Sequence, residues 1–188
     1  ATSERNVPQM SNFQFWGKYA RAKKVIAVTG TNGKSTTTAM LGLILEAAGF
    51  DPTVVVGTRV LQWGTNIRIG KSDWLVIEAD EYRAHMLEFK PHIAVITNIT
   101  PDHLDYYKDL DDIVAHFQKW IEKIPCDGGL VLNPNDAASQ KLRVGNLKVV
   151  IPAQMTRLHL QVPGQFNVAN ALAAGAAAQL LGISRRSL

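Results

Sequence analysis

The chain has 188 residues, a length typical of one domain, and its 46% hydrophobic and 19% charged residues indicate a globular protein rather than a disordered segment. Its single cysteine, Cys126, excludes an intrachain disulfide framework and a cysteine-based zinc site. The net charge of +4 arises within residues 1–24, so the rest of the chain is neutral and lacks the basic surface of a nucleic-acid-binding domain.

No segment of the sequence is apolar over the ~18 to 20 residues that a membrane-spanning helix requires, and the N-terminus has no secretory signal pattern. We therefore expect a cytoplasmic protein with neither a membrane nor a nucleic acid as partner. The sequence begins with Ala1 rather than with methionine, so we expect a processed product or a piece of a longer protein.

Residues 1–24 are polar and basic, and we interpret them as a lead-in or linker to one domain comprising residues 25–188. Apolar runs in that domain predict strands at 25–29, 53–56, 74–79, 92–99, 130–133, 148–151 and 158–162, and a hairpin over 60–69. Helical patterns and capping signals predict helices at 34–48, 82–88, 109–124, 136–143 and 166–181. Continuous apolar strands that alternate with helices predict an α/β fold, a mostly parallel sheet with helices on both faces.

The most informative segment joins the first predicted strand to the first predicted helix and reads Gly30-Thr31-Asn32-Gly33-Lys34-Ser35-Thr36. Backbone N–H groups at such a helix start are unpaired and the helix dipole adds partial positive charge, so phosphate oxygens bind there. Lys34 adds a full positive charge, and the Ser35 hydroxyl can ligate Mg²⁺. The general phosphate-loop pattern also requires a glycine where this chain has Val28, so an ordinary glycine-rich turn is the alternative.

Acidic clusters follow two later predicted strands. The first begins at Glu78 and continues through Asp80 and Glu81, and the second contains His103 between two aspartates. Ligands in open α/β sheets bind beyond the carboxyl ends of the strands, so both clusters are placed to reach a ligand of the glycine loop. A carboxylate such as Glu78 can complete the ligand shell of a Mg²⁺ ion beside phosphates. Read alone, Glu78 is as readily a charged strand end as a metal ligand, and His103 is more often a loop residue than a ligand.

The last predicted helix carries two amide side chains on one face. Asn167 and Asn170 lie three residues apart, directly after Phe166. Amide side chains both donate and accept hydrogen bonds, as the edge of a nucleotide base requires. The alternative is that Asn167 caps the helix and Asn170 is solvated.

The glycine loop, the two acidic clusters and the asparagine helix, in this order, resemble the central domain of the Mur ligase family, the ADP-forming ligases that build the peptidoglycan stem peptide. The match covers residues 25–183, with a shortened connection between Ile151 and Leu158. The resemblance implies a fold similar to that of phosphate-loop NTPases, with ATP and Mg²⁺ as cofactors.

The resemblance also implies the roles of individual residues. The loop from Gly30 to Thr36 would hold the ATP phosphates, and Asn167 and Asn170 would contact adenine. Glu78 and His103 would each bind one of two Mg²⁺ ions, with Ser35 sharing the first, and Lys34, Glu78 and His103 would form the catalytic set. In the family reaction, ATP phosphorylates a carboxylate of the substrate and an amino acid then attacks the acyl phosphate.

Family members have three domains, of which the N-terminal one holds the UDP-linked sugar and the C-terminal one brings the amino acid. Residues 1–24 are too short for the first, and Leu188 follows closely on the asparagine helix. We therefore expect both flanking domains to be absent and the isolated chain to be inactive in ligation. The UDP-N-acetylmuramate-type precursor and the amino acid would be bound through these missing domains.

Within the family, the motifs are most similar to those of the branch that adds L-alanine to UDP-N-acetylmuramate. The D-glutamate- and diamino-acid-adding branches carry a carbamylated lysine after the motif histidine, and here Lys119 lies one residue beyond that position. Phe166 is a departure, because the L-alanine branch usually has a histidine there. The alternatives are a tripeptide-recycling ligase, a folylpolyglutamate-type ligase and a non-catalytic nucleotide-binding module.

Overall fold

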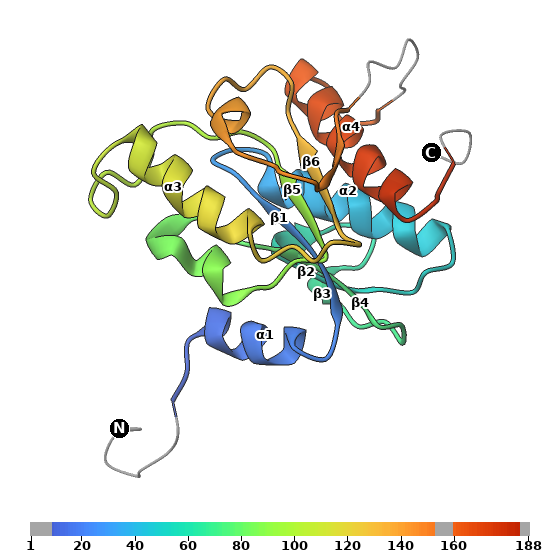
Figure 1. The fold of residues 1–188 in the computed structure, drawn as a ribbon. Helices are drawn as coiled ribbons and strands as arrows, with labels where there is room; N and C mark the ends of the chain where they lie inside the picture. Colours follow the sequence, from blue (N-terminus) through green and yellow to red (C-terminus); the bar gives the residue numbers. More distant parts are fainter. Residues whose placement is uncertain (1–8, 153–159, 185–188) are drawn as a thin grey trace.

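A seven-stranded sheet forms the centre of the fold, and the computed structural model describes it through residues 9–152 and 160–184 (Figure 1). The strand order is β3-β2-β4-β1-β5-β6-β7. The strands are β1 (Lys24–Thr29), β2 (Thr53–Val60), β3 (Thr65–Arg68), β4 (Trp74–Glu78), β5 (Ile93–Ile96), β6 (Gly129–Leu132) and β7 (Lys148–Val150). Only β3 is antiparallel to its neighbour in this sheet, so the predicted, mostly parallel α/β sheet is confirmed.

Helices cover both faces of the sheet (Figure 1). On one face, α2 (Lys34–Ala47) and α4 (Gln165–Leu180) pack against each other. The other face is covered by α1 (Asn12–Ala20), the 3-10 helix η2 (Tyr82–Glu88) and α3 (Leu110–Ile121). Within residues 9–152 and 160–184, no helix combines the length and apolar character needed to cross a membrane.

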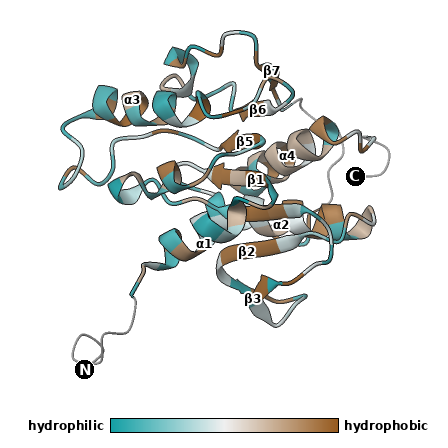
Figure 2. Ribbon diagram, turned by 60° about the horizontal axis from the view of Figure 1, so that its bottom comes forward, coloured by the Kyte–Doolittle hydropathy of each residue, from teal (hydrophilic) through white to brown (hydrophobic). Residues whose placement is uncertain are grey.

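Strand residues alternate between two hydrophobic cores, because successive side chains of a strand point to opposite faces. Val25 and Ala27 of β1 join the core beneath α1, η2 and α3, which includes the fully buried Trp120. Ile26 and Val28 join the core beneath α2 and α4. Figure 2 shows central strands such as β5 as largely hydrophobic, whereas α4 is paler because it is rich in alanine. Burial on both faces explains the continuous apolar runs in the sequence.

Three regions differ from the predicted elements. Residues 1–24 contain a helix that the sequence analysis does not predict, α1, whose start is capped by the Ser11 hydroxyl and whose Trp16 is buried. The predicted helix at 136–143 is reduced to the short 3-10 helix η3 (Ser139–Lys141). The predicted strand at 158–162 falls partly on residues 153–159, outside the described residues, and residues 160–162 form no strand.

The central position of β1 determines where the chemistry-bearing residues meet. Its neighbours are β4 on one side and β5 on the other, with Val28 in register with Glu78 and Thr29 with Ile96. The carboxyl ends of these three parallel strands therefore lie side by side. The glycine loop, the first acidic cluster and the segment that begins at Thr97 all leave the sheet at this edge.

Close packing of α2 on the sheet fixes the direction from which the glycine loop enters that helix. A Cβ atom at Gly42 would lie 2.8 Å from Cη2 of Trp63 and 2.9 Å from Cγ1 of the buried Val54. Both distances are below van der Waals contact, so α2 can approach the sheet this closely only with glycine at position 42.

We predict that Gly42→Ala lowers the free energy of unfolding by about 1–3 kcal/mol, because overpacking outweighs the ~1 kcal/mol that alanine adds in helix propensity. Urea denaturation measures the change. Ala39→Gly in the same helix calibrates the propensity term. A Gly42→Ala variant more stable than the wild type would contradict the packing argument.

Candidate functional site

Two glycines shape the loop between β1 and α2. Gly30 has φ +126° and Gly33 has φ +86°, a region that favours glycine. A Cβ atom at Gly30 would lie 2.3 Å from Oγ1 of Thr97, and one at Gly33 would lie 2.3 Å from Oδ1 of Asn170. The loop is therefore enclosed between the segment after β5 and helix α4.

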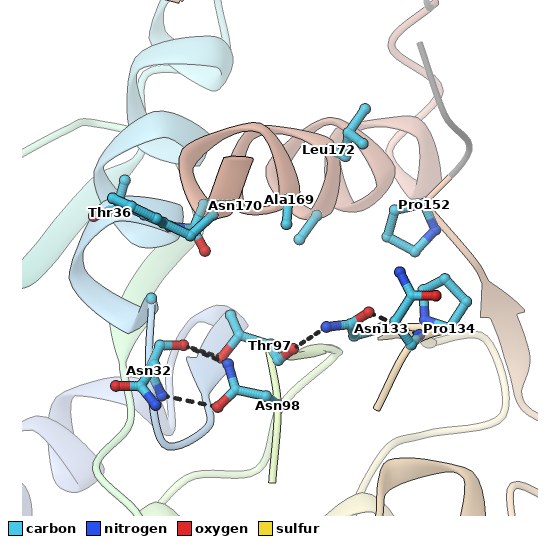
Figure 3. A pocket seen from close by; sticks show the side chains of 14 residues that line it. Asn32, Thr36, Thr97, Asn98, Asn133, Pro134, Pro152, Ala169, Asn170 and Leu172 are labelled. Carbon is cyan, nitrogen blue, oxygen red and sulfur yellow. Dashed lines mark hydrogen bonds between the residues drawn. The ribbon is translucent and has the colours of Figure 1, made fainter. Parts of the chain in front are cut away.

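The segment after β5 holds the loop through side chains to which the sequence analysis gave no role. The Thr97 hydroxyl donates to the Asn32 carbonyl oxygen at 2.6 Å, and the Asn98 amide donates to the same oxygen at 2.9 Å. The Asn32 N–H in turn donates to Oδ1 of Asn98 at 3.0 Å (Figure 3). Thr97 and Asn98 stand directly after a predicted strand, and that position at the sheet edge is the signal that could have identified them.

Helix α2 begins at Lys34 with Gly33 as its cap residue, and among the described residues no side chain caps this helix start. The amide groups of its first turn thus remain available to an anion, and the helix dipole favours negative charge there. This arrangement is compatible with the phosphate-binding hypothesis for residues Gly30–Thr36, which stays a prediction.

A cavity of about 690 Å³ opens beside the loop, beneath helix α4 (Figure 3). Asn170 points toward the loop and lines this cavity, whereas Asn167 is not among the residues that line it. The Asn167 amide instead donates to the Pro163 carbonyl oxygen at 2.7 Å, in the turn that leads into α4. The predicted pair of asparagines is thus divided between the cavity and the helix start.

The far end of the cavity is formed by residues that the sequence analysis missed. Asn133, Pro134 and Asn135 follow β6 directly and line the cavity, and the Asn133 amide donates to the Thr97 carbonyl oxygen at 2.9 Å. Phe166, 70% exposed, also lines it. Because β6 lies beside β5, these residues follow a strand end at the same edge of the sheet.

Lys34 does not project into solvent but bends back over the loop. Its ammonium group donates to the Gly30 carbonyl oxygen at 2.8 Å. It also lies 3.0 Å from Oε1 and 2.9 Å from Oε2 of Glu81. The side chains of Lys34 and Glu81 are 17% and 4% exposed, so this ion pair is largely withdrawn from water.

Ser35 and Glu78, both predicted metal ligands, are in direct contact. The Ser35 hydroxyl donates to Oε1 of Glu78 at 3.0 Å, and Oε2 of Glu78 accepts the N–H of Gly57 at 2.6 Å. A hydroxyl and a carboxylate side by side are hard oxygen donors of the type that Mg²⁺ prefers. The donor chemistry of this pair therefore fits the first predicted ion.

His103 belongs to a second group of possible ligands. Its Nε2 lies 3.7 Å from Oε1 of Glu81, and its ring lies 4.6 Å from the ring of Tyr82, between centroids. One ligand atom each from Asp80, Glu81 and His103 can be chosen so that all lie within 4.8 Å of one another. Ser35 thus pairs with Glu78, whereas His103 groups with Asp80 and Glu81, and the metal roles of these residues stay predictions.

The sequence of the central residues matches a known family. Residues 28–151 match the model of the Mur ligase middle domain. The chain belongs to the Mur ligase family.

Among its relatives in this family, the UDP-N-acetylmuramate--L-alanine ligase of Desulfitobacterium hafniense (strain Y51) is 36% identical over 96% of this chain and 46% of the relative. The enzyme of the same name from Caldicellulosiruptor bescii is 40% identical over 86% of this chain and 42% of the relative. The chain thus spans less than half the length of these relatives.

Solved structures of Mur ligases share the fold. The UDP-N-acetylmuramate:L-alanyl-gamma-D-glutamyl-meso-diaminopimelate ligase from Neisseria meningitides superposes with a TM-score of 0.85 at 26% identity, covering 97% of this chain and 69% of that one. The UDP-N-acetylmuramate-alanine ligase from Thermotoga maritima superposes with a TM-score of 0.83 at 26% identity, covering 99% of this chain and 48% of that one. The resemblance identified from the motifs is therefore confirmed at the level of sequence and of fold.

The backbone of Glu81 is held by Tyr107, whose buried hydroxyl donates to the Glu81 carbonyl oxygen. We predict that Tyr107→Phe lowers the free energy of unfolding by about 1 kcal/mol near pH 7. Burial raises the pKa of the Tyr107 phenol above its ordinary value. The unfolded chain therefore releases this proton first, and the stability advantage of the wild type falls as the pH rises above ~10.

Urea denaturation of both proteins between neutral and alkaline pH measures this difference. Tyr106→Phe is the control, because Tyr106 is the adjacent tyrosine and is 46% exposed. A stability difference for Tyr107→Phe that stays constant or grows above pH 10 would show that the buried phenol does not titrate as described.

Proposed function

We propose that the chain is the ATP-binding central domain of a cytoplasmic Mur-type ligase that joins an amino acid, L-alanine, to UDP-N-acetylmuramate. The observation that carries this proposal is the uncapped start of α2, where Lys34 and the Ser35–Glu78 pair meet beside the cavity under α4. The similarity to L-alanine-adding relatives supports the choice of substrates. The domain assignment, with residues 1–24 as a lead-in and 25–188 as the domain, is part of the proposal.

The glycine loop and the first turn of α2 would hold the phosphates of ATP. The amides of that turn would donate to phosphate oxygens, and Lys34, which lies against Glu81, would turn to a phosphate oxygen. Thr97 and Asn98 keep the loop in its shape through Asn32. A phosphate would thus meet donors that are already oriented toward it.

The cavity under α4 would hold the adenosine. Its volume of about 690 Å³ falls within the ~300–1,000 Å³ of small-molecule sites. Asn133, Asn135 and Asn170 supply amides that both donate and accept hydrogen bonds. Exposed Phe166 at the cavity supplies an apolar face for a base. The predicted role of Asn167 in adenine binding is less direct, because Asn167 is not among the residues that line the cavity and its amide donates to Pro163.

The reaction would proceed by transfer of the γ-phosphate to a carboxylate, followed by attack of the amine on the acyl phosphate. Lys34 would stabilise the negative charge of the transferring phosphoryl group, and no nucleophile of the protein is required. Ser35, Glu78 and His103 would hold Mg²⁺, which, when bound, neutralises phosphate charge. The UDP-linked precursor and the amino acid would be bound by parts of the protein other than residues 9–152 and 160–184.

A tripeptide-recycling ligase is the second candidate. The structural match to the Neisseria meningitides ligase, with its TM-score of 0.85, favours it. The two candidates share ATP and the nucleotide-sugar, and they differ in whether the added group is one amino acid or a peptide.

We predict that Lys34→Ala weakens ATP binding in the presence of Mg²⁺ by about 10- to 100-fold, because a charge-assisted contact to phosphate contributes roughly 1.5–3 kcal/mol. Isothermal titration calorimetry on the chain measures the affinity. The matched control is Lys119→Ala, which removes an exposed lysine from α3. Equal affinities for the wild type and Lys34→Ala would reject the phosphate-loop assignment.

We predict L-alanine-dependent formation of UDP-N-acetylmuramoyl-alanine and ADP by the protein that contains this chain in its natural length. Mass spectrometry of reactions with ATP, Mg²⁺ and UDP-N-acetylmuramate identifies the product. Glu78→Gln should lower the rate by at least tenfold, because it replaces a charged oxygen donor by an amide. Product with the tripeptide but not with L-alanine would assign the protein to the second candidate.

A further inference from the structure

The ion pair between Lys34 and Glu81 lies at the start of α2, where the proposed function places the ATP phosphates. The Glu81 side chain is 4% exposed, and Lys34 lies against both of its carboxylate oxygens. Oε2 of Glu81 accepts no hydrogen bond among the described residues, although Nζ of Lys34 is only 2.9 Å away. The carboxylate thus depends on the charge of Lys34 rather than on a full set of hydrogen bonds.

This dependence creates a conflict when a nucleotide binds. Lys34 belongs to the glycine loop, and a phosphate at the start of α2 attracts its ammonium group away from Glu81. Removing one partner of a buried ion pair is costly, because the remaining charge stays buried without compensation. Glu81 therefore needs another cation when Lys34 turns to a phosphate.

The surroundings of Glu81 provide ligands for such a cation. Asp80 and His103 each present one ligand atom. These two atoms and one carboxylate oxygen of Glu81 all lie within 4.8 Å of one another. Asp80 and His103 are partly exposed, so the position can be reached from solvent, whereas Glu81 forms its buried floor. Two carboxylates and an imidazole are suitable ligands for Mn²⁺, and the carboxylate oxygens also suit Mg²⁺.

We propose that Glu81 is an exchange residue: it neutralises Lys34 while the nucleotide is absent, and it ligates a divalent cation together with Asp80 and His103 once phosphate takes Lys34. The inference rests on the proposed nucleotide binding and adds Glu81 and Asp80 as ligands. It makes Lys34 and the cation competitors for one carboxylate. Nucleotide and cation then favour each other's binding, since each relieves the conflict that the other creates.

Because of this competition, we expect Glu81→Gln to strengthen ATP binding rather than to weaken it. The glutamine keeps the shape of the side chain but no longer neutralises Lys34, so ATP binding in EDTA should become at least tenfold tighter than in the wild type. With Mg²⁺ present this advantage should shrink, because the variant has lost a cation ligand. Calorimetric titration of the chain with ATP, in EDTA and in Mg²⁺, measures both affinities.

Two further variants separate the parts of the exchange. Asp80→Asn should weaken Mn²⁺ binding to the nucleotide complex at least tenfold, measured by electron paramagnetic resonance, without tightening ATP binding in EDTA. Lys34→Ala should tighten Mn²⁺ binding at least threefold in the absence of nucleotide, because it leaves Glu81 unneutralised. Asp111→Asn is the control, since this carboxylate is 81% exposed, pairs with Lys141 and should change neither affinity.

The outcomes distinguish this inference from the proposed function. If the wild type binds ATP with Mg²⁺ but Glu81→Gln binds ATP in EDTA no more tightly than the wild type does, the exchange is refuted and the proposed function stands. If the wild type binds no ATP, both fail. If Glu81→Gln does not fold, the Mn²⁺ measurements on Lys34→Ala and Asp80→Asn decide, and unchanged Mn²⁺ affinities in both overturn the inference.

Discussion

The pairing of β1 with β4 and β5 is the constraint on which the site depends. Parallel pairing brings three carboxyl ends to one edge of the sheet, and the register places Glu78 beside Val28, two residues before the glycine loop. From this alignment follow the contact of Ser35 with Glu78 and the contacts of Asn32 with Thr97 and Asn98. A shift of one residue in either pairing would turn these side chains to the opposite face.

The packing of α2 and α4 on one face of the sheet also helps to position the residues at the carboxyl ends of the strands. Helix α4 crosses above the loop, and its alanines allow it to lie close to α2 and to the sheet. The amide of Asn170 thereby reaches the position of Gly33, where no Cβ fits. The opposite face carries larger side chains, such as Trp120 and Phe117, which pack α3 against the sheet.

The sequence predicted most of the sheet, because strands buried on both faces leave unmistakable apolar runs, and it predicted the loop from its glycines. It did not predict α1, where polar Asn12 and Gln14 alternate with Phe13 and Phe15 ahead of the buried Trp16, nor the reduction of 136–143 to one short turn. Glu81 was visible in the acidic cluster, but only the fold shows that it, and not Glu78, faces Lys34. The burial of Glu81 and its contact with Lys34 depend on elements that are distant in the sequence, so a local sequence pattern does not predict them.

The hydrogen bonds that hold Asn32 between Thr97 and Asn98 have a consequence for how affinity arises. Because the loop already has its shape, the conformational entropy of ordering it is lost when the chain folds and not when a ligand arrives. Preorganisation of this kind makes the affinity for a ligand depend on the residues that hold the loop as well as on those that contact the ligand. The amide of Asn98, on the connection that follows β5, keeps the loop from sampling other conformations and would thereby lower the entropic cost of binding a ligand there.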